Sequence, residues 1–254
     1  MARGAAEYDQ LAELYDETRG GERRGDEYAG DVHARLVTTD DPVLEIGVGT
    51  GVVALGLVRR GRRVVGVDIA AKMLRRAHGR LGPVVVRGDA MTLPVPDARV
   101  TNAYSVWVLQ AVPDASRVVA EAARILRPGG RYVVCLTQKA APGDTIGHIL
   151  EDMGSRLRAL SSGANRAEPS AEQVIEWAET SGFVGRHERQ IREWNRSPAE
   201  VLDGIGRRMW VGLRDLDDET VEKVTRPAIK ALEALPESDL LRRGVGEILT
   251  LERI

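Results

Sequence analysis

Three glycines and an aspartate in the first third of the chain have the types and spacing of a nucleoside site. Gly47, Gly49 and Gly51 lie in the stretch VLEIGVGTG, directly after an apolar run. Glycines let a ligand lie close to the backbone, and the start of a following helix offers free N–H groups. Asp68 closes a second apolar run about 20 residues further on, where a carboxylate accepts hydrogen bonds from ribose hydroxyls. Capping of the next helix is the alternative role for Asp68.

A second aspartate extends this pattern towards an adenine. Asp89 ends a third apolar run in RGDAMTLP, where a carboxylate suits an exocyclic amine, and turn formation is its alternative role. A dinucleotide-binding dehydrogenase also has a glycine loop at this place, but its fingerprint puts the third glycine at position 52, which is Val52. An NAD-dependent oxidoreductase therefore stays as a less favoured alternative.

The elements that must position these residues alternate between strand and helix patterns. The expected strands cover residues 43–47, 62–68, 83–89, 100–106 and 131–137, with helices between them. The stretch RPGG is expected to stop the helix that precedes the fifth strand. Apolar strands that alternate with helices predict an α/β fold with a parallel sheet covered on both faces.

Further elements flank this regular part. Helices are expected before residue 40, with TRGGERRG as a break, and along the apolar stripe at 146–160. Ser170 with Gln173, and Ser197 with Glu200, predict capping boxes at two helix starts. Another helix is expected near Asp218, kinked or broken at Pro227. Two more strands are expected at 183–194 and 246–254.

The composition limits the classes of binding partner expected for this protein. The chain has 254 residues, 43% of them hydrophobic, and a net charge of −2, so no basic field indicates nucleic acid or an anionic membrane as partner. No apolar stretch resembles a signal peptide or a membrane span, which makes a cytoplasmic location the expectation. The single cysteine, Cys135, is expected in a buried strand. A homodimer is an option that the sequence leaves open.

Five stretches in order resemble the class I S-adenosylmethionine-dependent methyltransferases. They are VLEIGVGTG, VVGVD, RGDAMTLPVPD, SVWVLQAVPD and ARILRPGGRYVV, between residue 42 and about residue 138. The N-terminal YDQLAELYD is similar to the same region of small-molecule members. The resemblance implies a Rossmann-like, seven-stranded, mostly parallel sheet with an antiparallel last strand, helices on both faces and a helical lid. It implies S-adenosyl-L-methionine as cofactor and S-adenosyl-L-homocysteine as product.

The resemblance also implies the residues that contact this cofactor. Asp68 and Ile69 would meet the ribose and adenine, Asp89 the adenine amine, and Glu45 the methionine amine side. The full set implied is Tyr8, Tyr15, Arg24, Glu45, Gly47, Gly49, Gly51, Asp68, Ile69, Met73, Asp89, Ala90, Met91, Ser105 and Gln110. Many relatives carry histidine where this chain has Gln110, and glutamine cannot accept a proton at neutral pH. For the two tyrosines, packing of an amphipathic helix is the alternative role.

The sequence gives weaker signals for the catalytic residues and for the residues that bind the methyl acceptor. Methyl transfer mainly requires positioning, and a base is optional for a neutral amine acceptor. The candidate catalytic residues are His148, His33 and Tyr15. The candidates for the acceptor are Trp107, His148, Trp194, Arg207 and Trp210, with ordinary packing or solvated charge as the alternative. No cluster of metal ligands is evident, so no metal is predicted.

The expected organisation is one catalytic domain with helical additions. Its parts are an N-terminal helical cap at 1–40, a cofactor-binding core at 41–139, a lid insertion at 140–168, a core continuation at 169–196, a second helical lid insertion at 197–243 and a final core strand at 244–254. We expect transfer of a methyl group to nitrogen or oxygen of a small molecule in specialised, natural-product metabolism. A protein of this fold that catalyses a cyclisation or rearrangement, or only binds the cofactor, is the main alternative.

Overall fold

The computed structural model describes residues 8–9, 12–13, 15–18, 20–160, 168–210, 212–214, 216–238 and 241–254. The chain divides into two compact units. The first unit comprises residues 1–137, 168–188 and 247–254, and the second comprises residues 138–167 and 189–246. The predicted assignment of segments to core and lid remains a prediction, because compactness alone does not give either unit a role.

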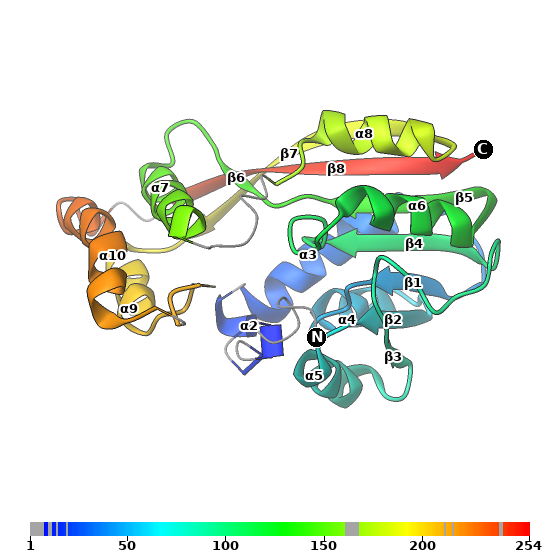
Figure 1. Ribbon diagram of the computed structural model, residues 1–254, viewed down its shortest axis with the longest axis horizontal. Coiled ribbons are helices and arrows are strands. Elements are labelled where there is room, and N and C mark those ends of the chain that lie inside the picture. The colour runs from blue at the N-terminus through cyan, green and yellow to red at the C-terminus, as the bar shows by residue number, and fades with distance from the viewer. Residues whose placement is uncertain are drawn as a thin grey trace. The chain divides into compact units, whose positions relative to one another are not determined.

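A mostly parallel sheet forms the centre of the first unit (Figure 1). Its strands are β1 (Val43–Ile46), β2 (Val64–Asp68), β3 (Val85–Arg87), β4 (Val100–Val106), β5 (Leu126–Cys135), β7 (Phe183–Asn195) and β8 (Leu241–Arg253). They lie in the order β3-β2-β1-β4-β5-β8, with β7 paired to β8. The first five pair in parallel and β8 runs antiparallel to β5, which confirms the predicted Rossmann-like sheet.

Helices cover both faces of this sheet because successive strand residues point to opposite sides. Val43 and Tyr104 lie in one core with α3 (Gly21–His33), α4 (Val52–Arg59) and α5 (Ala71–Leu81). Leu44 and Ala103 lie in the other core with α6 (Ala115–Ile125) and α8 (Ala171–Thr180). Figure 1 shows α6 and α8 together along one side of the sheet. The predicted capping box at Ser170 is present at the start of α8.

Two details of the first unit differ from the prediction. β5 begins at Leu126 and not after RPGG: Val100 pairs with Leu126 and Asn102 with Arg131, so the residues between them form an irregularity in the strand. The expected break at TRGGERRG is present but shorter than this stretch: one helix ends at Thr18, and α3 begins at Gly21, within TRGGERRG and not after it. A Cβ on Gly25 would lie 2.8 Å from the carbonyl oxygen of Val52, so this glycine permits close packing of α3 on α4.

The second unit is mainly helical. α7 (Thr145–Leu160), α9 (Pro198–Gly206) and α10 (Asp218–Glu233) share one apolar cluster that includes Met153, Val201 and Leu232. α9 starts with the predicted capping box of Ser197 and Glu200. A kink or a break was expected at Pro227; α10 continues through this residue, so the break is wrong and the kink remains a prediction.

Short strand pairing and a buried ion pair complete the second unit. β6 (Lys139–Ala140) pairs with β8 at Gly244 and Val245. The Asp144 carboxylate accepts from Arg242 Nε at 2.7 Å, and both side chains are buried. Within the part of the chain that the structure describes, no helix has the length and apolar character needed to cross a membrane.

Candidate functional site

The site lies where the carboxyl ends of β1, β2, β3 and β4 meet. The chain proceeds from β1 to β2 and β3 on one side and then returns to place β4 on the other side of β1. In open α/β sheets, ligands bind outside the carboxyl ends of the strands at this kind of reversal. The glycine loop after β1 and the segments that begin at Asp68 and Asp89 all come to this edge.

Gly49 forms the open part of the glycine loop. Its φ of 53° is left-handed, which glycine adopts without the steric cost that a Cβ brings. A Cβ built on Gly49 would meet no described heavy atom within 4 Å, so the space above this residue is free for a ligand. Its backbone N–H donates to Asp68 Oδ2 at 2.8 Å, which fixes the loop against the end of β2.

The other two glycines of the loop serve packing. A Cβ on Gly47 would lie 2.4 Å from Val108 Cγ2, so this residue lets the segment after β4 approach the loop. Gly51 has a φ of 82°, and a Cβ there would lie 3.2 Å from the Cα of Ala77 in α5. Gly51, expected beside the cofactor, is a residue at which α5 packs closely.

Both carboxylate oxygens of Asp68 accept hydrogen bonds from backbone N–H groups. Oδ2 accepts from Gly49, and Oδ1 accepts from Ala70 N at 2.8 Å at the start of α5. Burial raises the pKa of the Asp68 carboxyl, and the hydrogen bonds from Ala70 and Gly49 oppose that shift. Each carboxylate oxygen has a second acceptor site, so the side chain is also able to accept from a diol.

Asp89 organises the next segment in a similar way. Its Oδ1 accepts from Met91 N at 2.8 Å, which is the turn chemistry foreseen as an alternative. Asp89 also forms an isolated antiparallel bridge with Thr92. This turn directs Ala90 and Met91 towards the same cavity as Asp68.

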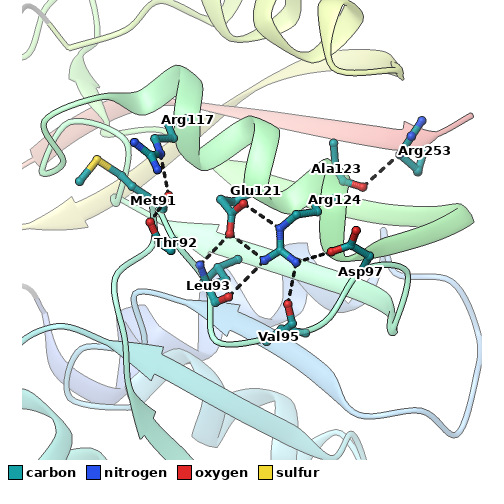
Figure 2. A network of polar contacts seen from close by, with 10 residues as sticks. All are labelled: Met91, Thr92, Leu93, Val95, Asp97, Arg117, Glu121, Ala123, Arg124 and Arg253. Carbon is teal, nitrogen blue, oxygen red and sulfur yellow. Dashed lines mark hydrogen bonds and ion pairs between the residues drawn. The ribbon is translucent and has the colours of Figure 1, made fainter.

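A polar network ties the segment after Asp89 to α6 (Figure 2). Glu121 Oε2 accepts from Leu93 N at 2.7 Å, and Arg124 donates to the carbonyl oxygens of Leu93 at 3.1 Å and Val95 at 2.8 Å. Arg124 also pairs with Glu121 and with Asp97. The hydrogen bond from Arg124 lowers the pKa of Glu121, so the network stays charged at neutral pH.

Glu45 supplies a buried acid on the other side of the glycine loop. It is 2% exposed, and its Oε2 accepts from Tyr104 Oη at 2.7 Å. Burial raises the pKa of Glu45 to about 8; the Tyr104 hydrogen bond opposes this shift and the charge of Asp68 adds to it. Burial and the Glu45 charge hold the pKa of Tyr104 far above its usual value, so Tyr104 remains the donor.

Two cavities open at this edge, named here after Asp68 and Glu45. The Asp68 cavity spans about 830 Å³ and the Glu45 cavity about 490 Å³, both counted with their open mouths. The Asp68 cavity is lined by Tyr8, Tyr15, Gly47, Gly49, Val67, Asp68, Ile69, Met73, Gly88, Asp89, Ala90, Met91, Val106, Trp107, Val108, Ala111, Val112 and Pro113. The Glu45 cavity is lined by Tyr15, Asp16, Gly21, Arg24, Gly25, Tyr28, Glu45, Gly47, Val48, Gly49, Thr50, Val52, Val53, Val106 and Trp107.

The two cavities share part of their walls, which we call the junction. Its residues are Tyr15, Gly47, Gly49, Val106 and Trp107. Trp107 has a φ of 57°, a costly conformation for a bulky residue that points to a functional constraint. Arg24 lies over its ring at 4.5 Å, and Gln110 Nε2 donates to its carbonyl oxygen at 2.6 Å.

Four predicted residues of the first unit do not line either cavity: Gly51, which packs against α5, and Ser105, Gln110 and His33. Ser105 is buried, with its Oγ 2.7 Å from Tyr132 Oη, while the next two residues reach the junction. Gln110 instead holds the backbone at Trp107. His33 is exposed at the end of α3.

Four predicted residues belong to the second unit and make their recorded contacts there. His148 is 55% exposed with its Nδ1 3.5 Å from Glu151 Oε2, and Arg207 pairs with Asp203 one helical turn away. The rings of Trp194 and Trp210 pack closely over Gly244 and Gly204. The catalytic and acceptor-binding roles assigned to these residues remain predictions.

Sequence reasoning missed Asp16, Arg80, Glu121 and Arg124. Asp16 and Thr50 line the Glu45 cavity and are joined by a hydrogen bond of 2.5 Å, although 34 residues separate them. Glu121 and Arg124 have the spacing of an ordinary surface pair on a helix, so no local signal distinguishes them. The contacts that give these residues a role come from distant parts of the chain.

The fold defines a Rossmann-like domain with two adjoining cavities at the carboxyl edge of its sheet. Residues 44–134 match the family model described as a methyltransferase domain. This core therefore matches a methyltransferase domain, which agrees with the class I S-adenosylmethionine-dependent methyltransferases that its motifs resemble. The match agrees with S-adenosylmethionine as the cofactor that the motifs imply.

Individual proteins agree with this assignment. A demethylmenaquinone methyltransferase of Tropheryma whipplei is 36% identical over 105 residues, covering 39% of this chain and 43% of that protein. A malonyl-(acyl-carrier protein) O-methyltransferase of Xylella fastidiosa is 32% identical over 165 residues, covering 59% of this chain and 54% of that protein. The chain thus spans about half the length of these relatives. The crystal structure of the (4+2)-cyclase SpnF has the same fold, with a TM-score of 0.60, 18% identity, and coverage of 98% of this chain and 95% of that one.

Proposed function

We propose that this protein transfers the methyl group of S-adenosylmethionine to a nitrogen or oxygen atom of a small molecule. One observation carries the proposal: two cavities with different chemistry meet at the junction. The Asp68 cavity offers carboxylates for a ribose and an adenine amine, and the Glu45 cavity offers an acid and a cation, Glu45 and Arg24, for an amino acid. A cofactor with a nucleoside at one end and an amino acid at the other fits this pair of cavities.

The residues present also fit the cofactor in shape. The open space above Gly49 accommodates a ligand that crosses from one cavity to the other. When bound, S-adenosylmethionine supplies a methyl group activated by a sulfonium that connects its two halves. The sulfonium therefore belongs at the junction, between the nucleoside and the amino acid, with Tyr15 and Trp107 as its neighbours.

The chemistry of the junction favours an acceptor that needs no proton removed by the enzyme. Among the described lining residues, the five that both cavities share include no carboxylate and no histidine. A neutral amine, or an oxygen that is already ionised, reacts once it is positioned in line with the methyl group. The similarity to an O-methyltransferase supports an oxygen acceptor as one of the two choices.

The small-molecule acceptor follows from charge and architecture. The net charge of −2 is unfavourable for binding nucleic acid or an anionic membrane surface. The helical second unit is an addition to the core, and in enzymes of this kind such additions select the acceptor. We place the reaction in specialised metabolism of the cytoplasm, with a homodimer as a form to be tested by solution mass.

Incubation with methyl-labelled S-adenosylmethionine and a panel of small amines, phenols and carboxylates tests the proposal. The expected result is label in one class of acceptor together with an equal amount of S-adenosylhomocysteine, and loss of both with Asp68→Ala. Label in nucleic acid would contradict the proposed acceptor class. Binding of NADH in place of S-adenosylmethionine would contradict the cofactor as well.

The similarity to the (4+2)-cyclase SpnF concerns the fold alone. The labelling experiment therefore has a second readout, which is a product that forms from the small molecule without incorporating the labelled methyl group. A rearranged product that needs the cofactor but contains no labelled methyl group would establish the cyclisation alternative.

A further inference from the structure

α2 (Tyr15–Thr18) is a helix of four residues whose position depends on contacts with the core. So short a helix is unstable on its own, because helix nucleation is unfavourable. Asp16 provides the contacts: its Oδ1 accepts from Thr50 Oγ1 at 2.5 Å and its Oδ2 accepts from Arg80 Nη2 at 2.5 Å. These bonds attach α2 to the glycine loop and to α5.

The three residues form a closed set of hydrogen bonds. Arg80 Nη1 donates to the carbonyl oxygen of Thr50 at 2.6 Å, and Arg76 Nη2 lies 3.4 Å from Asp16 Oδ2. The side chains of Asp16 and Arg80 are 15% and 21% exposed, so water screens this pair less than a surface pair. Both oxygens of Asp16 have donors from the protein, which makes positioning its role although it borders the Glu45 cavity.

A second carboxylate makes a parallel contact nearby. Asp9 Oδ1 accepts from Lys72 N at 2.6 Å in the first turn of α5, whose N-cap residue Ala70 has no capping side chain. A negative charge is favourable at that end of a helix. Ala12 is buried against Ala70 and Met73 in the same region. Asp9 and Ala12, both N-terminal to Asp16, therefore contact the start of α5, which is one of the two elements that Asp68 joins.

Tyr15 is the functional residue that these contacts locate. It lines both cavities and precedes Asp16 within one turn of α2, so its backbone cannot shift while Asp16 stays bound. Its ring packs edge-on against Tyr8 at a centroid distance of 6.2 Å. Release of Asp16 would disturb the Glu45 cavity more than the Asp68 cavity, because Asp16, Thr50 and Tyr15 line the first and only Tyr15 lines the second.

We propose that Asp16 is a positioning residue that, through Thr50 and Arg80, holds Tyr15 at the junction and thereby sets affinity for the amino-acid half of the cofactor. The proposal rests on the proposed function in one respect, that the two halves of the cofactor occupy the two cavities. It concerns binding and does not depend on the identity of the acceptor.

Calorimetric binding of two ligands by Asp16→Asn tests this role. S-adenosylhomocysteine occupies both cavities, whereas adenosine has only the nucleoside half. We expect the affinity for S-adenosylhomocysteine to fall about tenfold and that for adenosine to change less than about twofold, the effect of one lost charge-assisted hydrogen bond. Equal losses for both ligands, or no loss, would overturn the proposal, since a general loss of structure affects both.

Asp26→Asn is the matched control, because Asp26 pairs with Arg60 between α3 and α4 and lines neither cavity. It should leave both affinities within about twofold of the unsubstituted protein, as expected for a surface pair.

The double variant that combines Asp16→Ala with Arg80→Ala tests whether the two residues act together. Its loss of S-adenosylhomocysteine affinity should be smaller than the product of the two separate losses. If the two losses of affinity simply multiply in the double variant, the proposal that Asp16 acts through Arg80 is overturned. Failure of the unsubstituted protein to bind S-adenosylhomocysteine would instead refute the proposed function and the assignment of cavities with it.

Discussion

The Asp68 carboxylate at the end of β2 accepts a hydrogen bond at 2.8 Å from the N–H of Gly49, in the loop after β1. Its other oxygen accepts from Ala70 at the start of α5. The two roles considered for Asp68 from sequence, ribose acceptor and helix-start contact, are therefore compatible in one side chain. Asp68 shapes the loop that the ligand contacts and still has acceptor sites for ribose hydroxyls.

Asp68→Ala should weaken S-adenosylhomocysteine binding by about 1–3 kcal/mol, because the ribose and the Gly49 N–H both lose an acceptor. Calorimetric titration measures this change. Glu222→Ala, which removes a carboxylate that is 63% exposed and lines neither cavity, should leave the affinity unchanged. Full affinity in Asp68→Ala would show that this carboxylate does not contact the cofactor.

Gly49→Ala and Gly47→Ala should separate binding from stability. A methyl group on Gly49 projects into open space, so we expect lost cofactor affinity with a stability cost of about 1 kcal/mol from its left-handed φ. A methyl group on Gly47 would lie 2.4 Å from Val108, so its main effect should be destabilisation by about 1–3 kcal/mol from overpacking and strain. Urea denaturation and ligand titration measure the two effects. The reverse order of effects would contradict the roles assigned to these glycines.

The stability of the protein should fall with rising pH because of Glu45. Burial raises the pKa of Glu45 to about 8 in the folded state from 4.5, so the folded protein binds one more proton than the unfolded chain between these values. The contribution of Glu45 to the free energy of unfolding is therefore complete below pH 4.5 and is lost as pH rises towards 8. The slope reaches about 1.4 kcal/mol per pH unit in that window.

Glu45→Gln removes this titration while keeping a hydrogen-bond acceptor for Tyr104. Urea denaturation between pH 5 and pH 8 should show a smaller decline in stability for the variant than for the unsubstituted protein. Parallel curves would mean that the buried Glu45 carboxyl does not hold its proton at neutral pH.

Arg124→Ala should disturb the segment that carries Asp89 and Met91. It removes donors from two carbonyl oxygens and two carboxylates (Figure 2), so we expect a loss of about 2–3 kcal/mol in stability. We also expect weaker S-adenosylhomocysteine binding. Arg226→Ala, which breaks an exposed pair with Glu222 on α10, should change stability by less than about 0.5 kcal/mol. Similar effects of the two substitutions would contradict an anchoring role for Arg124.

The order of strands and helices and most helix starts were predictable because their signals are local. The capping boxes at Ser170 and Ser197 involve residues three positions apart, and strand periodicity involves alternate residues. Predictions failed where packing overrides local preference. Gly25 lies inside α3, where the lack of a side chain lets α3 pack closely against Val52 of α4. α10 likewise continues through Pro227.

The sequence by itself indicated the cofactor, because five stretches in order, from the glycine loop to ARILRPGGRYVV, resemble a family that uses S-adenosylmethionine. The spacing of these stretches follows from the strand–turn–helix repeat that positions them. Only the tertiary structure revealed the junction with its strained Trp107, the attachment of Asp16 to Arg80 across 64 positions, and the network that joins Glu121 to Leu93. Such contacts form when elements that are distant in the sequence pack together. No periodic pattern or fixed spacing of residues in the sequence indicates them. The acceptor depends on contacts of this second kind, which is why the motifs that identify the methyl donor do not identify the molecule that receives the methyl group.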